Sequence, residues 1–582
     1  MRLPEGLQIS NLLKRWRLEE HLTLYLLAIA VGILGGYGAI LFRLLIKGFQ
    51  LIFYQNSNDF LSFAHKVPFY WKIIIPAIGG LLVGLIVRWG TEKAKGHGVP
   101  ELIEAVVLRG GRISWRTATA RVSAAAVTIG SGGSVGREGP IIHIGSFLGS
   151  TVAQLMRLTR EKERILMSCG AAAGISATFH APIAGMLFAV EVLLGDFSLG
   201  TFSPIVLASV TAAVISGFHL GDFPAFIIPS FHIGSFWEYG LYPLLGILCG
   251  LVAVGFTASL YFCEDRFNNL PVPGWVRPAI GGMLLGSLLL VIPEVFGVGY
   301  GAINNALMSK MSLSLMGALI FGKILATSVS LGSGATGGIL APSLFIGAMT
   351  GGTIGWLAGE LLPGLSAASS YALVGMGALV AGSTHAPVTA ILLVFELSGN
   401  YHIVLPLLLA CILSTITSSL FQRGSIYTIK LLRRGVEISH GREQTILKNI
   451  VVRDVMVGDV KSVLESAPMV TVVDLFRKFN LACLTVVDDK GKLVGLISFH
   501  DIAGAALEEE MSYLLIARDM ADTEVDTVVP TDTLDKVLAK MEAEKVGQLP
   551  VVAEDGSGKL MGLVLERDVI SAYESELRLR WF

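Results

Sequence analysis

Charged residues are scarce in this chain of 582 residues: Asp, Glu, Lys and Arg make up 15% of it, against 53% hydrophobic residues. Soluble proteins usually carry about a quarter charged residues. The scarcity is confined to positions 22–420, whereas charges are frequent from Arg423 to Phe582. The composition therefore excludes a single soluble domain and predicts a membrane part followed by a soluble part.

Cysteines are also few, since the chain has five and none of them forms a C-x-x-C pair. A metal site or a disulfide framework is therefore not expected. The net charge is −1 and no basic tract is long enough to be a nucleic-acid arm, so no nucleic-acid partner is expected. The start of the chain has no short apolar stretch that ends in a cleavage site for a secretory leader.

Long apolar stretches follow one another through the first 420 residues. The first covers 22–42, long enough to cross a hydrocarbon core of ~30 Å. Basic residues at Lys14, Arg15 and Arg17 precede it, which predicts a cytosolic segment at 1–21. The plasma (inner) membrane is the default location expected for such a protein. Further candidates lie at 71–89, 117–130, 165–194, 204–218, 242–262, 279–296, 313–331, 341–361, 371–395 and 403–421. Several are shorter than the ~20 residues of a full span and contain Gly or Pro, which predicts helices broken inside the membrane.

This membrane part repeats itself. The segment GSGGSVGREGP, at 130–140, aligns with GSGATGGILAP at 332–342, an offset of 332 − 130 = 202 residues. The tripeptide His-Ala-Pro at 180–182 ahead of Glu191 aligns with the same tripeptide at 385–387 ahead of Glu396, an offset of 385 − 180 = 205. Duplicated halves with Gly-interrupted segments at corresponding positions indicate a transporter with a site where the halves meet.

Such glycine-rich segments suit an anion if each leads into a helix. The free N–H groups and the dipole of a helix N-terminus carry about half a positive charge, which attracts an anion more weakly than a full charge does. Pro140 and Pro342 suit the first turn of the helices that would follow. Two such ends that point at one centre would form a cage of partial charges. For either segment alone, helix packing or a turn is the alternative.

These motifs resemble those of the CLC family of chloride channels and exchangers. GREGP at 136–140, GILAP at 338–342 with Leu340 where Phe is usual, GHGVP at 96–100, and Ser-Ile-Tyr at 425–427 occur in the family's order. The resemblance covers 22–430. It implies a mainly α, inverted-repeat membrane bundle, normally a homodimer in the lipid bilayer with one path per subunit for chloride or other small anions.

The resemblance also implies a gate. The carboxylate of Glu138 would occupy the outer anion site and swing away when it is protonated or displaced; a buried pair with Arg137 is the alternative. The anion-binding positions implied are His97, Gly98, Gly136, Arg137, Gly139, Ile339, Leu340 and Tyr427. The Tyr427 hydroxyl would face the central anion, although an interfacial anchor is the alternative for this side chain.

His97 stands where chloride-selective members have Ser. A neutral imidazole can donate one hydrogen bond to an anion, or the ring can point away and leave backbone N–H groups to serve. Conduction that differs between about pH 5.5 and 7.5 is therefore a hypothesis, which the variant His97→Ser would test. Basic residues beside this motif, among them Lys95 and Arg121, either enrich anions at the inner mouth or set the membrane orientation.

Proton coupling is left open by the resemblance. In many proton-exchanging members a glutamate directly follows the position of Glu191, and here that residue is Val192. The replacement favours channel-like or weakly coupled anion flow. An H+/Cl− antiporter that uses a different proton path is the alternative. Glu191 itself is expected to cap or brace buried backbone.

The soluble tail repeats as well, after a linker at 431–448. Arg-Asp-Val-Met at 453–456 with GLIS-x-x-D at 495–501 parallels Arg-Asp-Met at 518–520 with GLVL-x-x-D at 562–568. The two halves resemble α/β CBS domains, at 449–507 and 514–576, which would lie in the cytosol. In that pattern Ser498 and Asp501 would hold the ribose of an adenine nucleotide, while the second module keeps only Asp568. No cofactor is required for transport, and a tail that only braces a dimer is the alternative.

Two other classes fit less well. A CBS-regulated cation transporter would need several membrane carboxylates that converge as ligands, and Glu138, Glu191 and Glu396 are too few and too differently placed. A membrane enzyme is not expected, because the sequence has no metal-ligand cluster, nucleophile elbow or P-loop.

Overall fold

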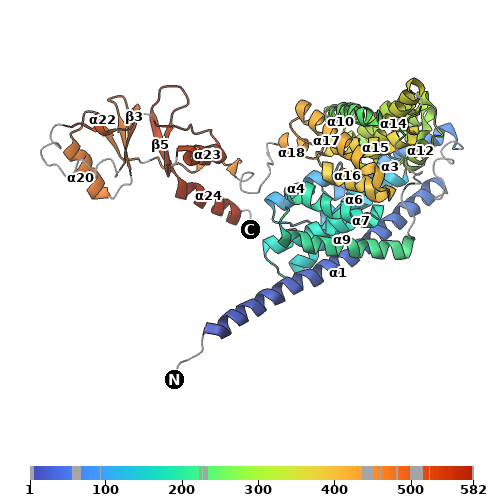
Figure 1. The fold of residues 1–582 in the computed structure, drawn as a ribbon, viewed down its shortest axis with the longest axis horizontal. Coiled ribbons are helices and arrows are strands. Elements are labelled where there is room, and N and C mark those ends of the chain that lie inside the picture. Colours follow the sequence, from blue (N-terminus) through green and yellow to red (C-terminus); the bar gives the residue numbers. More distant parts are fainter. Residues whose placement is uncertain are drawn as a thin grey trace. The chain divides into compact units, whose positions relative to one another are not determined.

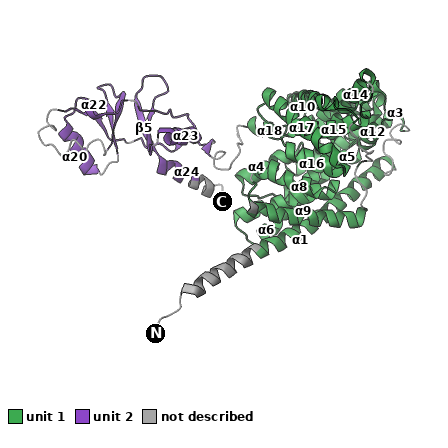
Figure 2. Cartoon of the chain, in the orientation of Figure 1, with its two compact units in different colours: residues 1–434 green, residues 435–582 purple. Residues whose placement is uncertain are grey.

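The chain divides into two compact units, Met1–Arg434 and Gly435–Phe582, coloured separately in Figure 2. The computed structural model describes all residues except 1–5, 56–66, 92–93, 196, 222–225, 227–233, 363, 435–446, 449, 459, 480–482, 499–514, 524, 545 and 580–582. The linker predicted at 431–448 therefore lies mostly outside the described residues, as do the ends predicted for the two CBS domains at 449, 507 and 514.

The first unit is helical throughout its described part (Figure 1). Its α-helices are α1 (Gly6–Tyr54), α3 (Phe69–Trp89), α4 (Val99–Leu108), α5 (Trp115–Gly130), α6 (Glu138–Leu155), α7 (Arg160–Phe179), α8 (Pro182–Phe188), α9 (Leu199–Leu220), α10 (Glu238–Asn268), α11 (Arg277–Val291), α12 (Tyr300–Leu307), α13 (Leu313–Gly332), α14 (Leu340–Leu361), α15 (Ala368–Thr384), α16 (Pro387–Ser398), α17 (Val404–Phe421) and α18 (Ile429–Leu432). A π-helical turn, η2 (Ala189–Leu194), continues α8, and short 3-10 turns stand at η3 (Pro293–Val295) and η4 (Tyr401–Ile403). Within the described ranges, seven helices are long and apolar enough to cross a membrane.

Two predicted spans, 165–194 and 371–395, are each in fact two helices. The apolar stretch at 165–194 is interrupted at His180, which has a left-handed φ of 55° and ends α7, while Pro182 begins α8. The second half repeats the break, since His385 also has a φ of 55° and Pro387 begins α16. The residue before a proline avoids the α conformation, so the Ala-Pro that follows each histidine stops the helix there.

The two halves pack in the same way. Helices α6 and α7 meet where Gly145 faces Gly170, and a Cβ on either glycine would overlap a carbonyl oxygen of the other helix. Helices α14 and α15 meet where Gly347 faces Gly375, in the same close approach. These pairs lie at the offsets of the sequence repeat. Small residues let helix backbones approach closely in lipid, where packing drives association.

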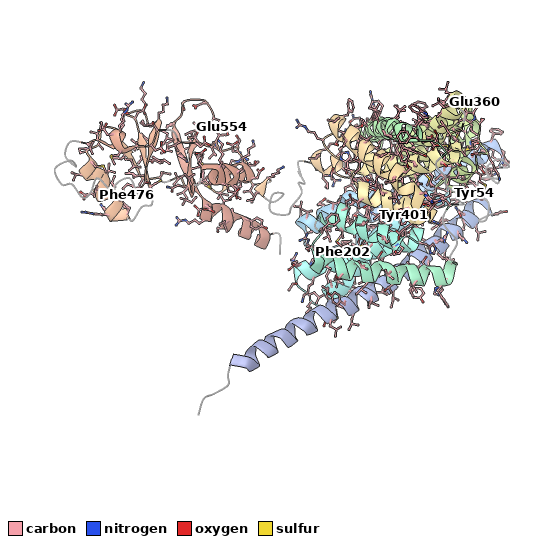
Figure 3. All side chains as sticks on the ribbon, in the orientation of Figure 1. Tyr54, Phe202, Glu360, Tyr401, Phe476 and Glu554 are labelled. Carbon is pink, nitrogen blue, oxygen red and sulfur yellow. The ribbon has the colours of Figure 1, made fainter. Side chains whose placement is uncertain are left out.

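The second unit contains two small sheets (Figure 3). In the first module, β1 (Ser462–Leu464) pairs in parallel with β2 (Cys483–Val487), β3 (Leu493–Ser498) pairs antiparallel with β2, and α20 (Met469–Phe479) packs through Phe476. In the second module, β4 (Gln548–Val552) pairs antiparallel with β5 (Leu560–Leu565), beside α23 (Leu534–Glu544) and α24 (Glu566–Leu579).

The modules exchange their first segments. Val452, at the start of the first module's sequence, is buried in the hydrophobic core of the second, and Val457 pairs with Leu563. In return Ala517, from α22 (Ala517–Met520), is buried in the core of the first module, and Leu496 pairs with Asp522. Each core thus contains residues from the other module's sequence, so neither core is complete without the other module.

Candidate anion site

The two glycine-rich motifs meet in the middle of the first unit. Gly136 and Gly338 form an antiparallel bridge in which each backbone N–H donates to the other's carbonyl oxygen, at 2.7 and 2.6 Å. The N-terminal ends of α6 and α14 are thereby brought together. The third motif joins them, since Gly96 pairs in parallel with Thr336.

Glu138 is the first residue of α6, and its carboxylate lies between the two motifs. The side chain is 1% exposed. Its Oε2 accepts a hydrogen bond from the backbone N–H of Ala341, in the first turn of α14, at 3.4 Å. A Cβ on Gly136 or Gly338 would press against this same oxygen, so the glycines leave the room that the carboxylate fills. The Glu138 carboxyl group thus lies at the N-terminus of a helix from the opposite half of the repeat, where the helix dipole favours a negative charge.

Arg137 does not pair with Glu138. Across the described residues, no ion pair joins the two side chains within 4.0 Å. The Arg137 guanidinium instead lies over the ring of Tyr300, 4.9 Å from its centroid. The two side chains therefore form no direct ion pair.

The rings of His97 and Tyr427 contact one another at a tilt. Their rings are 5.8 Å apart, and they are 4% and 2% exposed. Neither ring nitrogen of His97 has a hydrogen-bond partner among the described residues. Phe188, which ends α8, packs edge-on against the other side of the tyrosine ring at 6.4 Å. Tyr427 is thus buried rather than an interfacial anchor. A neutral His97 has one N–H group that could donate to an anion.

The remaining predicted positions lie around the same place. Gly98 precedes α4 with a φ of 83°, and Gly139 lies so close to the His97 carbonyl oxygen that a Cβ would stand 2.8 Å from it. Ile339 is the N-cap of α14 and Leu340 is its first residue. Three helix N-termini, those of α4, α6 and α14, therefore approach one small region that the sequence motifs share.

Comparison with known proteins identifies the family. Residues 79–419 match the family described as "Voltage gated chloride channel", and residues 452–508 and 517–575 each match the CBS domain. The chain belongs to the CLC family. It carries a C-terminal pair of CBS domains.

Several relatives of this CLC protein share most of their length with it. A ClcB-like protein of Ralstonia nicotianae is 34% identical over 70% of this chain and 97% of its own. The voltage-gated ClC-type chloride channel ClcB of Citrobacter koseri is 31% identical over 69% and 97%. The solved structure of a slow cyanobacterial Cl−/H+ antiporter is 26% identical, with a TM-score of 0.64 over 71% of this chain and 97% of that one. A eukaryotic CLC transporter, 19% identical with a TM-score of 0.62, covers 94% of the chain and shows the fold alone.

Two glutamates of this CLC protein cap helices in the opposite half. Glu191, in η2, accepts hydrogen bonds from the backbone N–H groups of Val388 and Thr389 at the start of α16, at 3.2 and 2.7 Å. Glu396, in α16, accepts from the N–H groups of Ile183 and Ala184 at the start of α8, at 2.9 and 2.7 Å. Each carboxylate satisfies free donors at a helix N-terminus. Val192, beside Glu191, is half-buried.

Arg121 does not line an inner mouth. It is 1% exposed and pairs with Glu101 at 3.6 Å, while Lys430 pairs with the other oxygen of Glu101 at 2.9 Å. A guanidinium N–H of Arg121 also donates to the Gly96 carbonyl oxygen at 3.5 Å. The arginine therefore braces the Gly96 motif from behind.

Three contributors were not among the site residues predicted from the sequence. Ala341 supplies the backbone donor to Glu138, one residue beyond the two that were named. Tyr300 donates a second hydrogen bond to the same carboxylate. Lys323 is fully buried in α13 and donates to the carbonyl oxygens of Val295 and Gly297. A lone lysine inside an apolar stretch was a usable signal, because ionisable groups in a membrane segment are functional candidates. Tyr300 gave no such signal.

The predicted nucleotide residues are only partly described. Asp501 lies outside the described residues. Ser498 ends β3, and Asp568 lies in the first turn of α24 with its side chain 29% exposed.

Proposed function

We propose that this CLC protein conducts chloride and related small anions across the membrane, with Glu138 as the gate. The observation that carries the proposal is the seat of the Glu138 carboxylate on the backbone N–H of Ala341, at the N-terminus of α14. A carboxylate and a halide compete for the same donor, so the side chain must leave before an anion can take its place.

Below the gate, His97 and Tyr427 are the proposed partners of the anion on its way through the protein. A buried phenol and an imidazole N–H replace part of the water that the ion sheds, without a full charge that would hold it. The narrow approach of α4, α6 and α14 supplies backbone donors around them. The preference for chloride over other halides is itself proposed from the family, because this chain has His97 in place of the serine of chloride-selective members.

We infer channel-like or weakly proton-coupled flow. Val192 cannot carry a proton, and both oxygens of Glu191 are engaged at the start of α16. The second candidate is an H+/Cl− antiporter with a different proton path, which the likeness to the slow cyanobacterial antiporter favours.

The reversal potential of the reconstituted protein, under opposed chloride and pH gradients, tests this choice. The proposal predicts a potential at or near the chloride equilibrium value, which the pH gradient scarcely shifts. A large displacement by the pH gradient would instead establish exchange. A potential that follows a potassium gradient would exclude anion transport altogether.

The gate makes its own prediction. In Glu138→Gln the side chain loses the charge that competes with chloride. We therefore expect the rate of chloride efflux from liposomes to change by tenfold or more. Glu360→Gln is the control, because Glu360 lies exposed near the end of α14 (Figure 3). Equal efflux from Glu138→Gln, the control and the wild type would refute the gating role.

The cellular setting is proposed from the family. We place the protein in the plasma (inner) membrane as a homodimer, with its N-terminus and CBS domains in the cytosol. An adenine nucleotide is the proposed ligand of the CBS pair, through Ser498, Asp501 and Asp568. Calorimetry with ATP and AMP on the whole protein and on Asp568→Ala would test the ligand, and identical traces without heat of binding would remove it.

A further inference from the structure

The second donor to the gate comes from a tyrosine outside every motif. Tyr300 is the first residue of α12, and its hydroxyl donates to Oε1 of Glu138 at 3.1 Å. The other oxygen, Oε2, faces the N–H of Ala341. Each carboxylate oxygen therefore has its own donor, one from backbone and one from a phenol. Hydrogen bonds to a charged acceptor are stronger than those between neutral groups.

The ring of Tyr300 is held in place from two sides. The Arg137 guanidinium covers one face, 4.9 Å from the ring centroid, and Phe226 packs edge-on at 5.0 Å. A cation over an aromatic face and an edge-to-face pair both favour one orientation of the ring. Because Arg137 directly precedes Glu138, the tyrosine is fixed against the backbone that carries the gate.

The loop before Tyr300 is anchored by a buried lysine. Nζ of Lys323 donates to the carbonyl oxygens of Val295 and Gly297, at 3.2 and 2.9 Å, and lies 4.9 Å from the centroid of the Phe345 ring. A charged group with no exposure is costly unless it is hydrogen-bonded, and these carbonyl oxygens satisfy it. The lysine thus fixes the course of the chain into α12.

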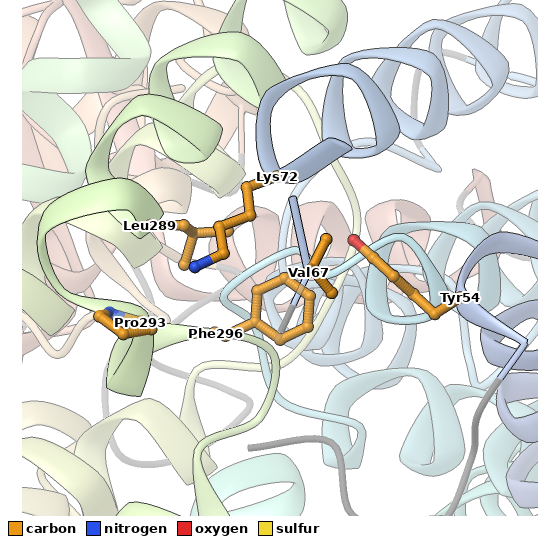
Figure 4. A pocket seen from close by; sticks show the side chains of 6 residues that line it. All are labelled: Tyr54, Val67, Lys72, Leu289, Pro293 and Phe296. Carbon is orange, nitrogen blue, oxygen red and sulfur yellow. The ribbon is translucent and has the colours of Figure 1, made fainter. Parts of the chain in front are cut away.

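The same loop is tied to the segment that leads into the gate. Ser134 donates to the Val295 carbonyl oxygen at 2.9 Å, and the N–H of Gly297 donates to Gly132 at 3.3 Å. Behind the loop, Phe296 packs edge-on against Tyr54 at 5.6 Å beside a small pocket (Figure 4). The distance between Tyr300 and Glu138 is therefore set by several contacts on both sides of the loop.

From this geometry we propose that Tyr300 is the latch of the gate: a positioning residue that holds the Glu138 carboxylate in the anion-excluding position. The proposal rests on the gating role proposed for Glu138. When an anion displaces the carboxylate, the hydrogen bond from the phenol is lost with it. Without the phenol hydroxyl, a lower chloride concentration suffices to displace the gate.

The direct test is Tyr300→Phe, which keeps the ring, its packing and the guanidinium above it. We expect the chloride concentration at half-maximal conductance or flux to fall about tenfold, as loss of one hydrogen bond to a charged group predicts. The matched control is Tyr242→Phe on α10, which removes another buried phenol-to-carboxylate bond, from Tyr242 to Glu238 at 3.1 Å. The control should keep the wild-type chloride dependence. A tenfold shift in the control too would mean that any lost phenol loosens the protein, and would overturn the proposal.

A second substitution should change the half-maximal chloride concentration in the opposite direction. Incorporation of 3-fluorotyrosine at position 300 keeps the fold and makes the phenol a stronger donor, so the half-maximal chloride concentration should rise. The latch is refuted if both Tyr300→Phe and the fluorinated residue leave this concentration at the wild-type value.

The background variant Glu138→Ala separates the latch from the gate. If Glu138→Ala alters flux and Tyr300→Phe adds nothing in that background, both proposals stand. If Glu138→Ala alters flux but Tyr300→Phe shifts nothing in the wild-type background, the latch fails and the gate survives. If Glu138→Ala leaves flux untouched, the gating role fails first and the latch falls with it.

Discussion

Among single residues, Glu191 and Glu396 have a structural role that follows directly from their hydrogen bonds. Each glutamate accepts two backbone N–H groups at the start of a short helix in the other half of the repeat. Free N–H groups at a helix start need partners, and a carboxylate also complements the helix dipole. The two positions therefore have the same structural role, whatever else Glu191 does in coupling.

Removal of either cap should lower stability. For Glu191→Ala and Glu396→Ala we expect the midpoint of thermal unfolding in detergent to fall, because each loses charged hydrogen bonds worth about 1–3 kcal/mol. The control Glu360→Ala, at an exposed position, should leave the midpoint within error of the wild type.

Other unfolding midpoints would change the roles assigned to these two glutamates. If Glu191→Ala unfolds at the wild-type midpoint yet abolishes proton movement, Glu191 acts as a proton relay and the channel-like reading is wrong. If Glu396→Ala alone is destabilised, the two halves are not equivalent at this position.

Cys483 allows a chemical prediction in the second unit. Burial raises the pKa of its thiol to about 12. The thiolate is the reactive form, so at pH 8 the native thiol should react with maleimide at least a hundredfold more slowly than in denaturant. Peptide mass mapping of labelled full-length protein would measure this. Fast native labelling of Cys483 would show that the strand β2 opens readily.

At the scale of elements, much of the bundle follows from sequence alone. Short apolar stretches with Gly and Pro predicted broken helices, and the repeat offsets predicted paired motifs whose helices do meet. The breaks at His180 and His385 were missed because hydropathy does not distinguish one apolar helix from two, although the Ala-Pro step carries the signal. The exchange of segments between the CBS modules was also missed, since it depends on non-local pairing such as Val457 with Leu563.

The site was predictable in so far as it lies in motifs. Glu138, His97 and Tyr427 could be named because glycines or a family pattern mark their positions. Tyr300 could not be named, because its role depends on the position of the loop before it. Lys323, on a separate helix, anchors that loop. Contacts between distant segments are set by packing, and no local pattern records them.

Helix packing in the repeat gives a prediction for Gly145. In Gly145→Ala the new Cβ would overlap the carbonyl oxygen of Gly170, so α6 and α7 must separate. We expect a fall of several degrees in the unfolding midpoint and a lower yield of folded protein. Gly317→Ala on α13 is the control: nothing lies within 4 Å of its Cβ, so alanine should raise helix stability slightly, by up to about 1 kcal/mol. Equal midpoints for the two variants would contradict the close packing.

For the whole molecule, the proposed transport and the proposed nucleotide binding lie in different units. All proposed anion contacts lie before Arg434, and the CBS pair forms the second unit. A chain that ends at Arg434 is therefore expected to retain chloride flux in liposomes at a rate within a few-fold of the full protein, and to lose any response to adenine nucleotides. Loss of flux from a truncated protein that still elutes as a folded dimer would show that the tail is needed for conduction.

The claim on which the account depends is that the Glu138 carboxylate fills an anion site. Crystals of the wild type and of Glu138→Gln soaked in bromide test it directly through anomalous scattering. The account predicts a bromide peak within hydrogen-bonding reach of the Ala341 N–H in the variant and none there in the wild type. A variant without a peak at that position, or a wild type with bromide and carboxylate both in place, would contradict it.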